Sequence, residues 1–265
     1  MADATLLSRV TILAVGVSQY DNPHFRNLRG PERDIERLHE LLVENPSTAL
    51  FKPDQFLDLV NPDSSKLRRF LSEYVMDRSA DNDILLFYFS GHGVPIGRGD
   101  FGFCTTDTII HPLTNLPLPL SVVKFSEFLS SINIANIVPI VMIDACYSGM
   151  VGRTARITPS EAIGSIHDQI HTVSASSYAL LCSCADNQTT IDTPEGGLFS
   201  FYLQQVSTEG LPSSVRNESL LTLQDIFARL QERVHSYSGD AVPRLYLGPT
   251  LPEFPFVMVS VFLFL

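Results

Sequence analysis

The chain has 265 residues, of which 45% are hydrophobic, so it can bury the core of one large α/β domain. Its formal net charge is −11 and it has no cluster of lysines and arginines, which argues against a nucleic-acid partner and favours basic ones. The N-terminus has no signal-peptide pattern, so we expect a cytoplasmic protein. We expect neither a metal site nor a disulfide framework, because the four cysteines have the spacing of neither: Cys104, Cys146, Cys182 and Cys184.

Short apolar segments alternate with amphipathic ones through the first half of the chain. Segments that are apolar on consecutive positions are typical of strands buried on both faces of a parallel sheet. Such strands are expected at residues 10–17, 56–60, 83–89 and 137–143. Helices are expected from Pro31, after Pro62 and at about 124–132, with a hairpin near 100–106. This order predicts an α/β fold with a mostly parallel sheet and right-handed crossovers.

The second half of the chain begins with a segment, residues 150–177, that has no sustained periodicity and is expected to be a flexible loop. A strand at 178–184, a polar turn at 186–194 and a helix at 198–206 are expected to follow. The last clear helix begins after Thr222, and Asp225 stands three residues later, as in a capping box. Since no linker separates two cores, we expect a single domain over residues 1–265.

The C-terminal residues 254–265 are strongly apolar, but they are too few to span a membrane as a helix. We favour a buried edge strand. A segment that touches a membrane or binds a partner is the alternative.

A histidine and a cysteine follow two of the predicted strands. His92 stands in Ser90-Gly91-His92-Gly93 and Cys146 in Asp144-Ala145-Cys146. Ligands bind beyond the carboxyl ends of parallel strands, so neighbouring strands would hold the thiol and the imidazole over one substrate. A thiol near its free pKa needs such a base in order to act as a nucleophile. The flanking glycines are expected to leave room for a substrate carbonyl, and the amides of Gly93 and Cys146 to form an oxyanion hole.

Each residue alone has an ordinary explanation, because a cysteine after a buried strand is usually a small apolar residue. Their joint occurrence in these contexts favours catalysis. The chain resembles the caspase-like cysteine peptidases, and metacaspases, paracaspases and their bacterial relatives more than animal caspases. The separation of 54 positions from His92 to Cys146 is similar to the separation of roughly 50 in caspases. The resemblance covers nearly the whole chain and implies a three-layer sandwich and endopeptidase activity through a Cys/His dyad. Tyr147 departs from the histidine that is usual in metacaspases.

The residue two positions before the cysteine predicts the substrate class. Animal caspases carry glutamine there, but this chain has Asp144, which would repel an acidic substrate residue and pair with a basic one. We therefore expect cleavage after arginine, in preference to lysine. The resemblance implies that Asp34 also lines this S1 pocket, and Asp186 matches more loosely. The alternatives are a solvated first-turn acid for Asp34 and a turn residue for Asp186.

Arg153 and Arg156, in the predicted loop after Cys146, are candidate processing sites for the enzyme itself or for an upstream protease or regulator. Activation by calcium has little support, because Asp81-Asn82-Asp83 is not an EF-hand loop. The expected partners are proteins with exposed basic residues, and no cofactor, nucleic acid or membrane is expected. A catalytically silent caspase-like interaction module is the alternative. No GxSxG, GxGxxG or Walker motif supports another hydrolase or a nucleotide-binding protein.

Overall fold

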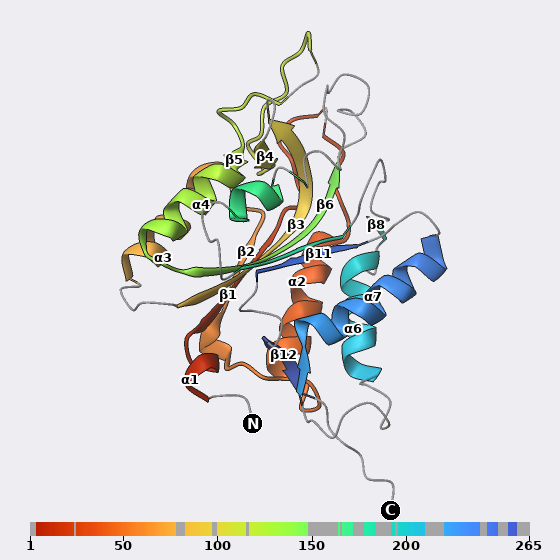
Figure 1. Cartoon of the computed structure of the whole chain (residues 1–265). Helices are drawn as coiled ribbons and strands as arrows, with labels where there is room; N and C mark the ends of the chain where they lie inside the picture. Colours follow the sequence, from red (N-terminus) through yellow and green to blue (C-terminus); the bar gives the residue numbers. More distant parts are fainter. Residues whose placement is uncertain are drawn as a thin grey trace, which may run out of the picture.

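A mostly parallel β-sheet forms the middle layer of the computed structural model (Figure 1). The structure describes residues 4–23, 25–77, 83–96, 100–114, 117–147, 164, 166–171, 178–183, 192–193, 196–209, 220–238, 243–248 and 254–258, and at 146, 147, 192 and 193 it describes the backbone. The predicted residues Asp81, Asn82, Arg153, Arg156, Cys184 and Asp186 lie outside this part of the chain.

Eight strands in the described residues form this sheet. They are β1 (Val10–Gly16), β2 (Phe56–Val60), β3 (Ile84–Ile96), β4 (Asp100–Phe103), β5 (Val123–Lys124), β6 (Val138–Tyr147), β7 (Ala179–Cys182) and β11 (Arg244–Leu247). The order is β11-β7-β6-β3-β1-β2, with β4 beside β3 and β5 beside β4. The neighbours from β7 to β2 run parallel, whereas β11 and β4 are antiparallel to their partners.

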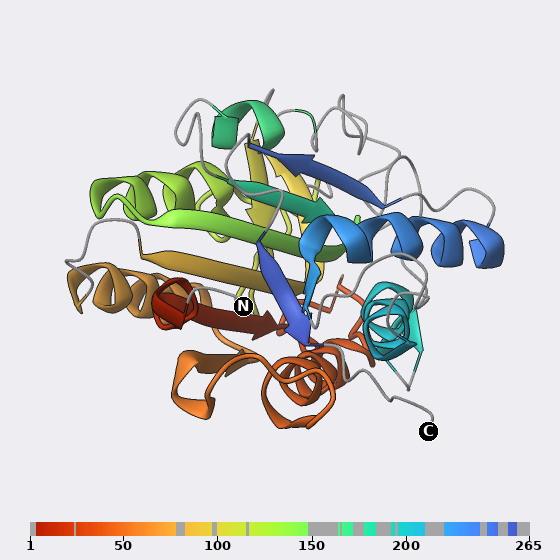
Figure 2. The ribbon, with the colours of Figure 1, turned by 60° about the horizontal axis from the view of Figure 1, so that its bottom comes forward.

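Helices cover both faces of the sheet, which confirms the predicted three-layer α/β fold (Figures 1 and 2). On one face lie α3 (Ser64–Asp77) and α4 (Phe125–Ile134). On the other lie α2 (Pro31–His39), its continuation η1 (Glu40–Glu44), α6 (Leu198–Glu209) and α7 (Leu223–Ser238). A short helix, α1 (Ala4–Leu7), precedes the sheet. Successive residues of β3 enter different cores, Phe87 that of α3 and α4 and Tyr88 that of α2 and α6, so the strand is apolar on consecutive positions.

The two strands that carry His92 and Cys146 are longer than predicted. We expected them to end at residues 89 and 143, but β3 continues to Ile96 and β6 to Tyr147. The reactive residues therefore lie within strands rather than after them. The extension has a simple cause: the backbone of the polar Ser-Gly-His-Gly segment pairs with β6, and from Gly93 onwards the strand also pairs with the antiparallel β4, whatever the side chains are. The predicted hairpin thus uses the end of β3 as its first strand.

The second half of the chain differs from the prediction in three places. Residues 166–171, inside the predicted loop, are helical, and Ile166 and Ile170 are buried in the core of α3 and α4. The antiparallel edge strand β11 was not predicted, because four residues carry too short a pattern. Part of the predicted polar turn forms β8 (Asp192–Thr193), which pairs with β9 (Gly196–Gly197). The capping box before α7 is confirmed, since the Thr222 amide donates to Asp225 at 3.0 Å and the Asp225 amide donates to the Thr222 hydroxyl at 3.2 Å.

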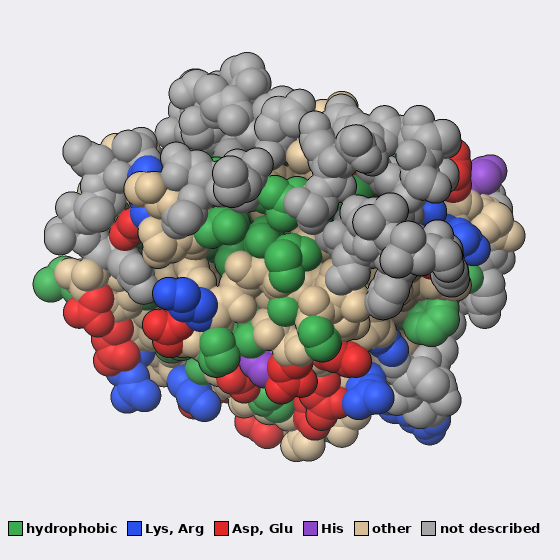
Figure 3. Space-filling model, turned by 90° about the horizontal axis from the view of Figure 1, so that it is seen from below, with side chains coloured by type: hydrophobic (Ala, Val, Ile, Leu, Met, Phe, Trp, Pro, Cys, Tyr) green, Lys and Arg blue, Asp and Glu red, His purple; other side chains and the backbone are tan. Residues whose placement is uncertain are grey.

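The described part of the apolar C-terminal segment forms a strand, β12 (Pro255–Met258), as expected. It pairs with β10 (Leu220–Thr222) in a separate two-stranded sheet rather than with the edge of the central one, and Phe256 and Val257 are buried. Among the described residues, no helix has both the length and the apolar character needed to cross a membrane. Figure 3 shows acidic side chains gathered along one side of the face seen from below.

Candidate active site

The pairing of β3 with β6 brings the predicted histidine and cysteine together. In this parallel ladder His92 is the Cα partner of Cys146, although they lie 54 positions apart in the chain. The same register pairs Ser90 with Asp144 two residues earlier and Gly93 with Tyr147 one residue later. The backbone segments that carry the candidate dyad, the candidate oxyanion amides and one candidate pocket carboxylate are therefore immediate neighbours in the middle of the sheet.

The imidazole of His92 is held by the loop between β1 and α2. Its Nε2 lies 2.8 Å from the carbonyl oxygen of Arg26, and because a carbonyl can only accept, Nε2 carries the hydrogen. The ring packs against Tyr20, with the centroids 4.8 Å apart, and against Phe25 at 5.5 Å. The Tyr20 hydroxyl also accepts the backbone N–H of His92 at 2.8 Å. These contacts fix the ring and place the lone pair of the neutral imidazole on Nδ1.

Asn61, which directly follows β2, holds the start of the loop between β1 and α2. The side-chain oxygen of Asn61 accepts the backbone N–H of Ser18 at 2.8 Å and that of Gln19 at 3.0 Å. Its amide nitrogen donates to Glu32 at the start of α2, at 2.8 Å. Asn61 has φ of 48°, a left-handed conformation that asparagine adopts more readily than most residues. Sequence reasoning missed Asn61 and the loop residues Tyr20, Phe25 and Arg26, since the loop has no periodic pattern.

The glycines that flank His92 serve the packing of the protein itself. A Cβ on Gly93 would lie 2.2 Å from the ring of Phe101 on β4. A Cβ on Gly91 would lie 3.2 Å from the Tyr20 hydroxyl and 3.1 Å from the Phe89 ring. We expected these glycines to make room for a substrate carbonyl. The structure gives a nearer cause, because β4 and the β1–α2 loop pack directly on the backbone around His92.

Asp34, in the first turn of α2, is only 2% exposed, so it is not a solvated first-turn acid. Its carboxylate accepts hydrogen bonds from the hydroxyl of Ser90 at 2.8 Å, the amide of Gly197 at 2.7 Å and the hydroxyl of Ser200 at 2.5 Å. Burial raises the pKa of Asp34, and these hydrogen bonds together with the charge of Arg37 act to lower it. Sequence reasoning missed Ser200 and Gly197, although a Gly-Gly pair just before a helix was visible.

Asp144 approaches the same place from β6 and is 3% exposed. A Cβ on Gly197 would lie 2.9 Å from an oxygen of Asp144 and 3.2 Å from one of Asp34, so both carboxylates lie against that glycine. The Tyr88 hydroxyl donates to Oδ2 of Asp144 at 3.3 Å. Within the described residues, Oδ1 of Asp144 accepts no hydrogen bond. Burial, followed by the charge of Asp34, raises the pKa of Asp144 to about 8.

These two carboxylates form a buried acidic pair next to the backbone of His92 and Cys146. A negative charge on Asp34 opposes ionisation of Asp144, and an added cation between them would offset this repulsion. The arrangement is suited to bind a basic side chain. The third predicted carboxylate, Asp186, lies outside the described residues, as do Arg153 and Arg156.

Comparison with known proteins identifies the family of the chain. The model of the caspase domain family matches residues 9–252, which include every residue of the site described above. The chain belongs to the caspase domain family. Family membership indicates a cysteine peptidase. A search of curated proteins gave no match.

Solved structures of this fold cover almost the whole chain. A protein from Geobacter sulfurreducens is 18% identical, with a TM-score of 0.61 over 94% of this chain and 99% of its own. Caspase-1 from Spodoptera frugiperda is 13% identical, with a TM-score of 0.55 over 90% of this chain and 88% of its own. The Drosophila initiator caspase Dronc is 12% identical, with a TM-score of 0.58 over 95% and 84%. At these identities the likeness concerns the caspase fold.

Proposed function

We propose that this caspase-family protein is a cysteine endopeptidase that cleaves proteins after a basic residue, with Cys146 as the nucleophile and His92 as the base. The observation that carries the proposal is the register of β3 against β6, which pairs His92 with Cys146 and Ser90 with Asp144. One pairing supplies the chemistry and the other supplies a carboxylate for the substrate side chain. Both belong to one rigid ladder.

The reaction follows from the roles of these groups. His92 takes the thiol proton of Cys146 while the sulfur attacks the scissile carbonyl carbon, and the negative charge develops on the carbonyl oxygen. The backbone amides of Gly93 and Cys146 would donate to that oxygen. As the intermediate collapses, the C–N bond breaks and the leaving amine takes the proton from His92. Water then attacks the thioester, gives a proton to His92, releases the carboxylic acid and restores the thiol.

Specificity for a basic residue rests on the buried carboxylate pair. A guanidinium or ammonium group placed between Asp34 and Asp144 lets both carboxylates ionise and supplies the hydrogen bond that Oδ1 of Asp144 lacks within the described residues. An acidic side chain would add a third like charge to a buried site. The planar guanidinium can bridge two carboxylates with paired hydrogen bonds, so arginine is preferred to lysine. Proteins with exposed arginines are therefore the proposed substrates.

The experiment is cleavage of a peptide library by the purified full chain, combined with labelling by an electrophilic peptide that ends in arginine. We expect cuts after arginine, abolished by Cys146→Ala and by His92→Ala, and an adduct on Cys146. Cys182→Ala is the matched control, because Cys182 is a buried cysteine on β7 that the proposal does not use. It should cleave and label like the wild type.

Two results would count against the proposal. A preference for aspartate before the cut would overturn the pocket assignment while leaving the dyad intact. Absence of both cleavage and adduct, with a folded protein, would favour the non-catalytic interaction module instead.

Activation by cleavage in the segment after Cys146 is part of the proposal. An enzyme that cuts after arginine has its own candidate sites at Arg153 and Arg156. Mixing active enzyme with a Cys146→Ala copy should cut that copy near these residues, as read by mass spectrometry. A copy that stays intact after long incubation would exclude self-processing in trans and direct attention to an upstream protease.

A further inference from the structure

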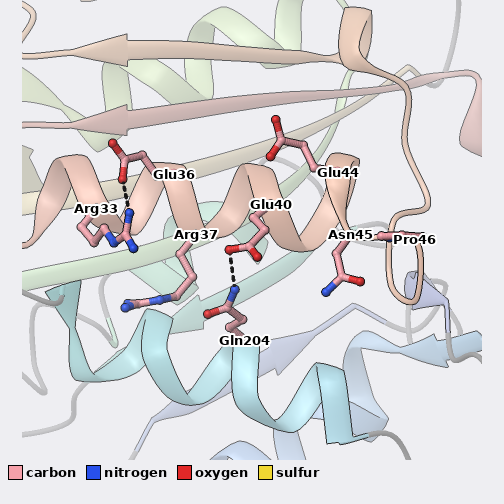
Figure 4. Close-up of a pocket in the computed structure, with 8 residues that line it drawn as sticks. All are labelled: Arg33, Glu36, Arg37, Glu40, Glu44, Asn45, Pro46 and Gln204. Atoms are coloured by element: carbon pink, nitrogen blue, oxygen red, sulfur yellow. Dashed lines mark hydrogen bonds and ion pairs between the residues drawn. The ribbon is translucent and has the colours of Figure 1, made fainter.

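An arginine lies beside the carboxylate pair, on the same helix as Asp34 and three residues after it. Arg37 is only 9% exposed, and arginine is almost never this buried without a partner of opposite charge. Figure 4 shows its side chain leaving α2 towards α6, at the edge of a polar groove of about 450 Å³. Its guanidinium carbon lies 5.5 Å from the centre of the Phe201 ring on α6.

A single hydroxyl joins this arginine to Asp34. Nη1 of Arg37 donates to the Ser200 hydroxyl at 2.7 Å, and that hydroxyl lies 2.5 Å from Oδ1 of Asp34. Because the guanidinium can only donate, the Ser200 hydrogen is available for the carboxylate. Nη1 itself is 3.7 Å from the same oxygen of Asp34. Arg37 therefore acts on Asp34 through Ser200 and directly by its charge.

The backbone leaves space for this contact. Gly196 has φ of 107°, which glycine adopts at little cost, and a Cβ there would lie 2.6 Å from Nη1 of Arg37. The next residue, Gly197, gives its amide to Asp34. Any side chain at position 196 would displace the guanidinium, so the Gly-Gly pair before α6 holds Arg37 and the carboxylates at close range.

The charges of the cluster can be counted over the described residues that face Asp34. They are Arg37 from α2, Tyr88 and Ser90 from β3, Asp144 from β6, the Gly197 amide from β9 and Ser200 from α6. In this set two carboxylates meet one permanent cation. With both carboxylates ionised the cluster lacks one positive charge, which is the charge of one arginine or lysine side chain.

We propose that Arg37 is a positioning residue that determines specificity: it keeps Asp34 ionised through Ser200, so that the pocket takes one further cation. This inference rests on the proposed function, since the further cation is the basic side chain of the substrate. Arg37 does not contact the scissile bond and serves no step of the chemistry at Cys146. It decides whether both carboxylates can be charged together when substrate is bound.

The test is calorimetric binding of agmatine, a free guanidinium compound, to the full chain at pH 7, which needs no catalysis. Wild type should bind it, and Arg37→Met should bind it at least about tenfold more weakly, because only one carboxylate then ionises in the complex. Arg37→Lys should recover part of the affinity. The matched control is Arg33→Met, because Arg33 is on the same helix but is exposed and pairs with Glu36 at the surface (Figure 4). It should bind like the wild type.

A second measurement separates positioning from a general loss of structure. With an arginine peptide, Arg37→Met should raise KM and leave kcat within about twofold, and its pH optimum for binding should move upwards because the charge of Arg37 acts to lower the pKa of Asp34. Ser200→Ala, which removes the hydroxyl bridge, should shift KM in the same direction. Thermal melting verifies that each variant is folded.

Several outcomes would overturn the inference. The inference is wrong if agmatine binds Arg37→Met as tightly as the wild type or more tightly, or if it fails to bind the wild type. It is also wrong if Arg37→Met lowers kcat as strongly as it raises KM, or if Arg33→Met shows the same effects as Arg37→Met. The failure of the proposed function would look different. The wild type would then bind agmatine in an Arg37-dependent way and yet cleave no peptide.

Discussion

Replacing Asp144 by asparagine is the sharpest test of the buried carboxylate pair. The change removes the negative charge while keeping the shape of the neutral acid. Burial, followed by the charge of Asp34, raises the pKa of Asp144 from 3.8 to about 8, so the free pocket holds this group protonated at neutral pH. A bound guanidinium needs the ionised form. Binding of a basic side chain therefore releases a proton and becomes tighter as the pH rises towards the pKa of the free pocket.

The size of the effect follows from that pKa. At pH 7 Asp144 is protonated in about nine in ten free pockets. Each further pH unit below the pKa lowers the fraction of pockets with ionised Asp144 about tenfold. The dissociation constant of an arginine peptide should therefore fall about tenfold from pH 6 to pH 7, fall by several-fold more up to pH 8, and then level off. Asp144→Asn should show neither the slope nor the tight binding above pH 8. Its loss of affinity is thus larger at pH 8 than at pH 6.

The assay is direct binding to the Cys146→Ala protein, because the titration of the dyad would distort a rate. A peptide with citrulline in place of arginine is the control, since it has nearly the same shape without the charge. Its affinity should stay flat with pH. The reasoning is refuted if the arginine peptide binds equally at pH 6 and pH 8, or if Asp144→Asn keeps the slope.

Three further predictions concern the packing around His92 and the N-terminal cap of α7. Gly93→Ala should lower the stability by about 1–3 kcal/mol, because its Cβ would meet the ring of Phe101, and Phe101→Leu in the same chain should recover part of the loss in urea denaturation. If Gly93→Ala is as stable as the wild type, the packing argument is wrong. Tyr20→Phe removes the hydroxyl that accepts the His92 amide and should lower kcat about tenfold with KM unchanged; an effect on KM alone would contradict this. Thr222→Ala should lower the stability by about 1 kcal/mol and leave peptide cleavage unaltered, whereas a loss of activity would tie α7 to the site.

Most of the sheet could be predicted because its strands are recognisable from the apolar pattern of a few consecutive residues. Runs such as Ile84–Phe89 are apolar on every position, and a strand can be so only when helices cover both faces of the sheet. The same pattern under-estimated where β3 and β6 end. Beyond Phe89 the strand is held by backbone pairing with β4 and β6, and backbone pairing leaves no trace in the side chains. The short edge strand β11 escaped prediction for a related reason.

The candidate dyad and Asp144 could be predicted because their motifs follow recognisable apolar segments, whereas their surroundings could not. Tyr20, Phe25 and Arg26 reach His92 from a loop whose course depends on tertiary contacts, among them the bonds of Asn61. Arg37 belongs to a polar helix face that would be solvated if α6 did not cover it. The sequence pattern of a single helix cannot show which neighbour will bury its charges.

The central ladder also bears on the biosynthesis of the proposed peptidase. His92 meets its partner only after another 54 residues have been made and β6 has docked beside β3. Pairing over such a distance has to overcome the entropy of closing the intervening loop. Gly197 and Ser200, which donate hydrogen bonds to Asp34, are synthesised later still. The proposed activity therefore requires the chain at least as far as α6, because the paired strands and the groups that bind Asp34 are complete only then.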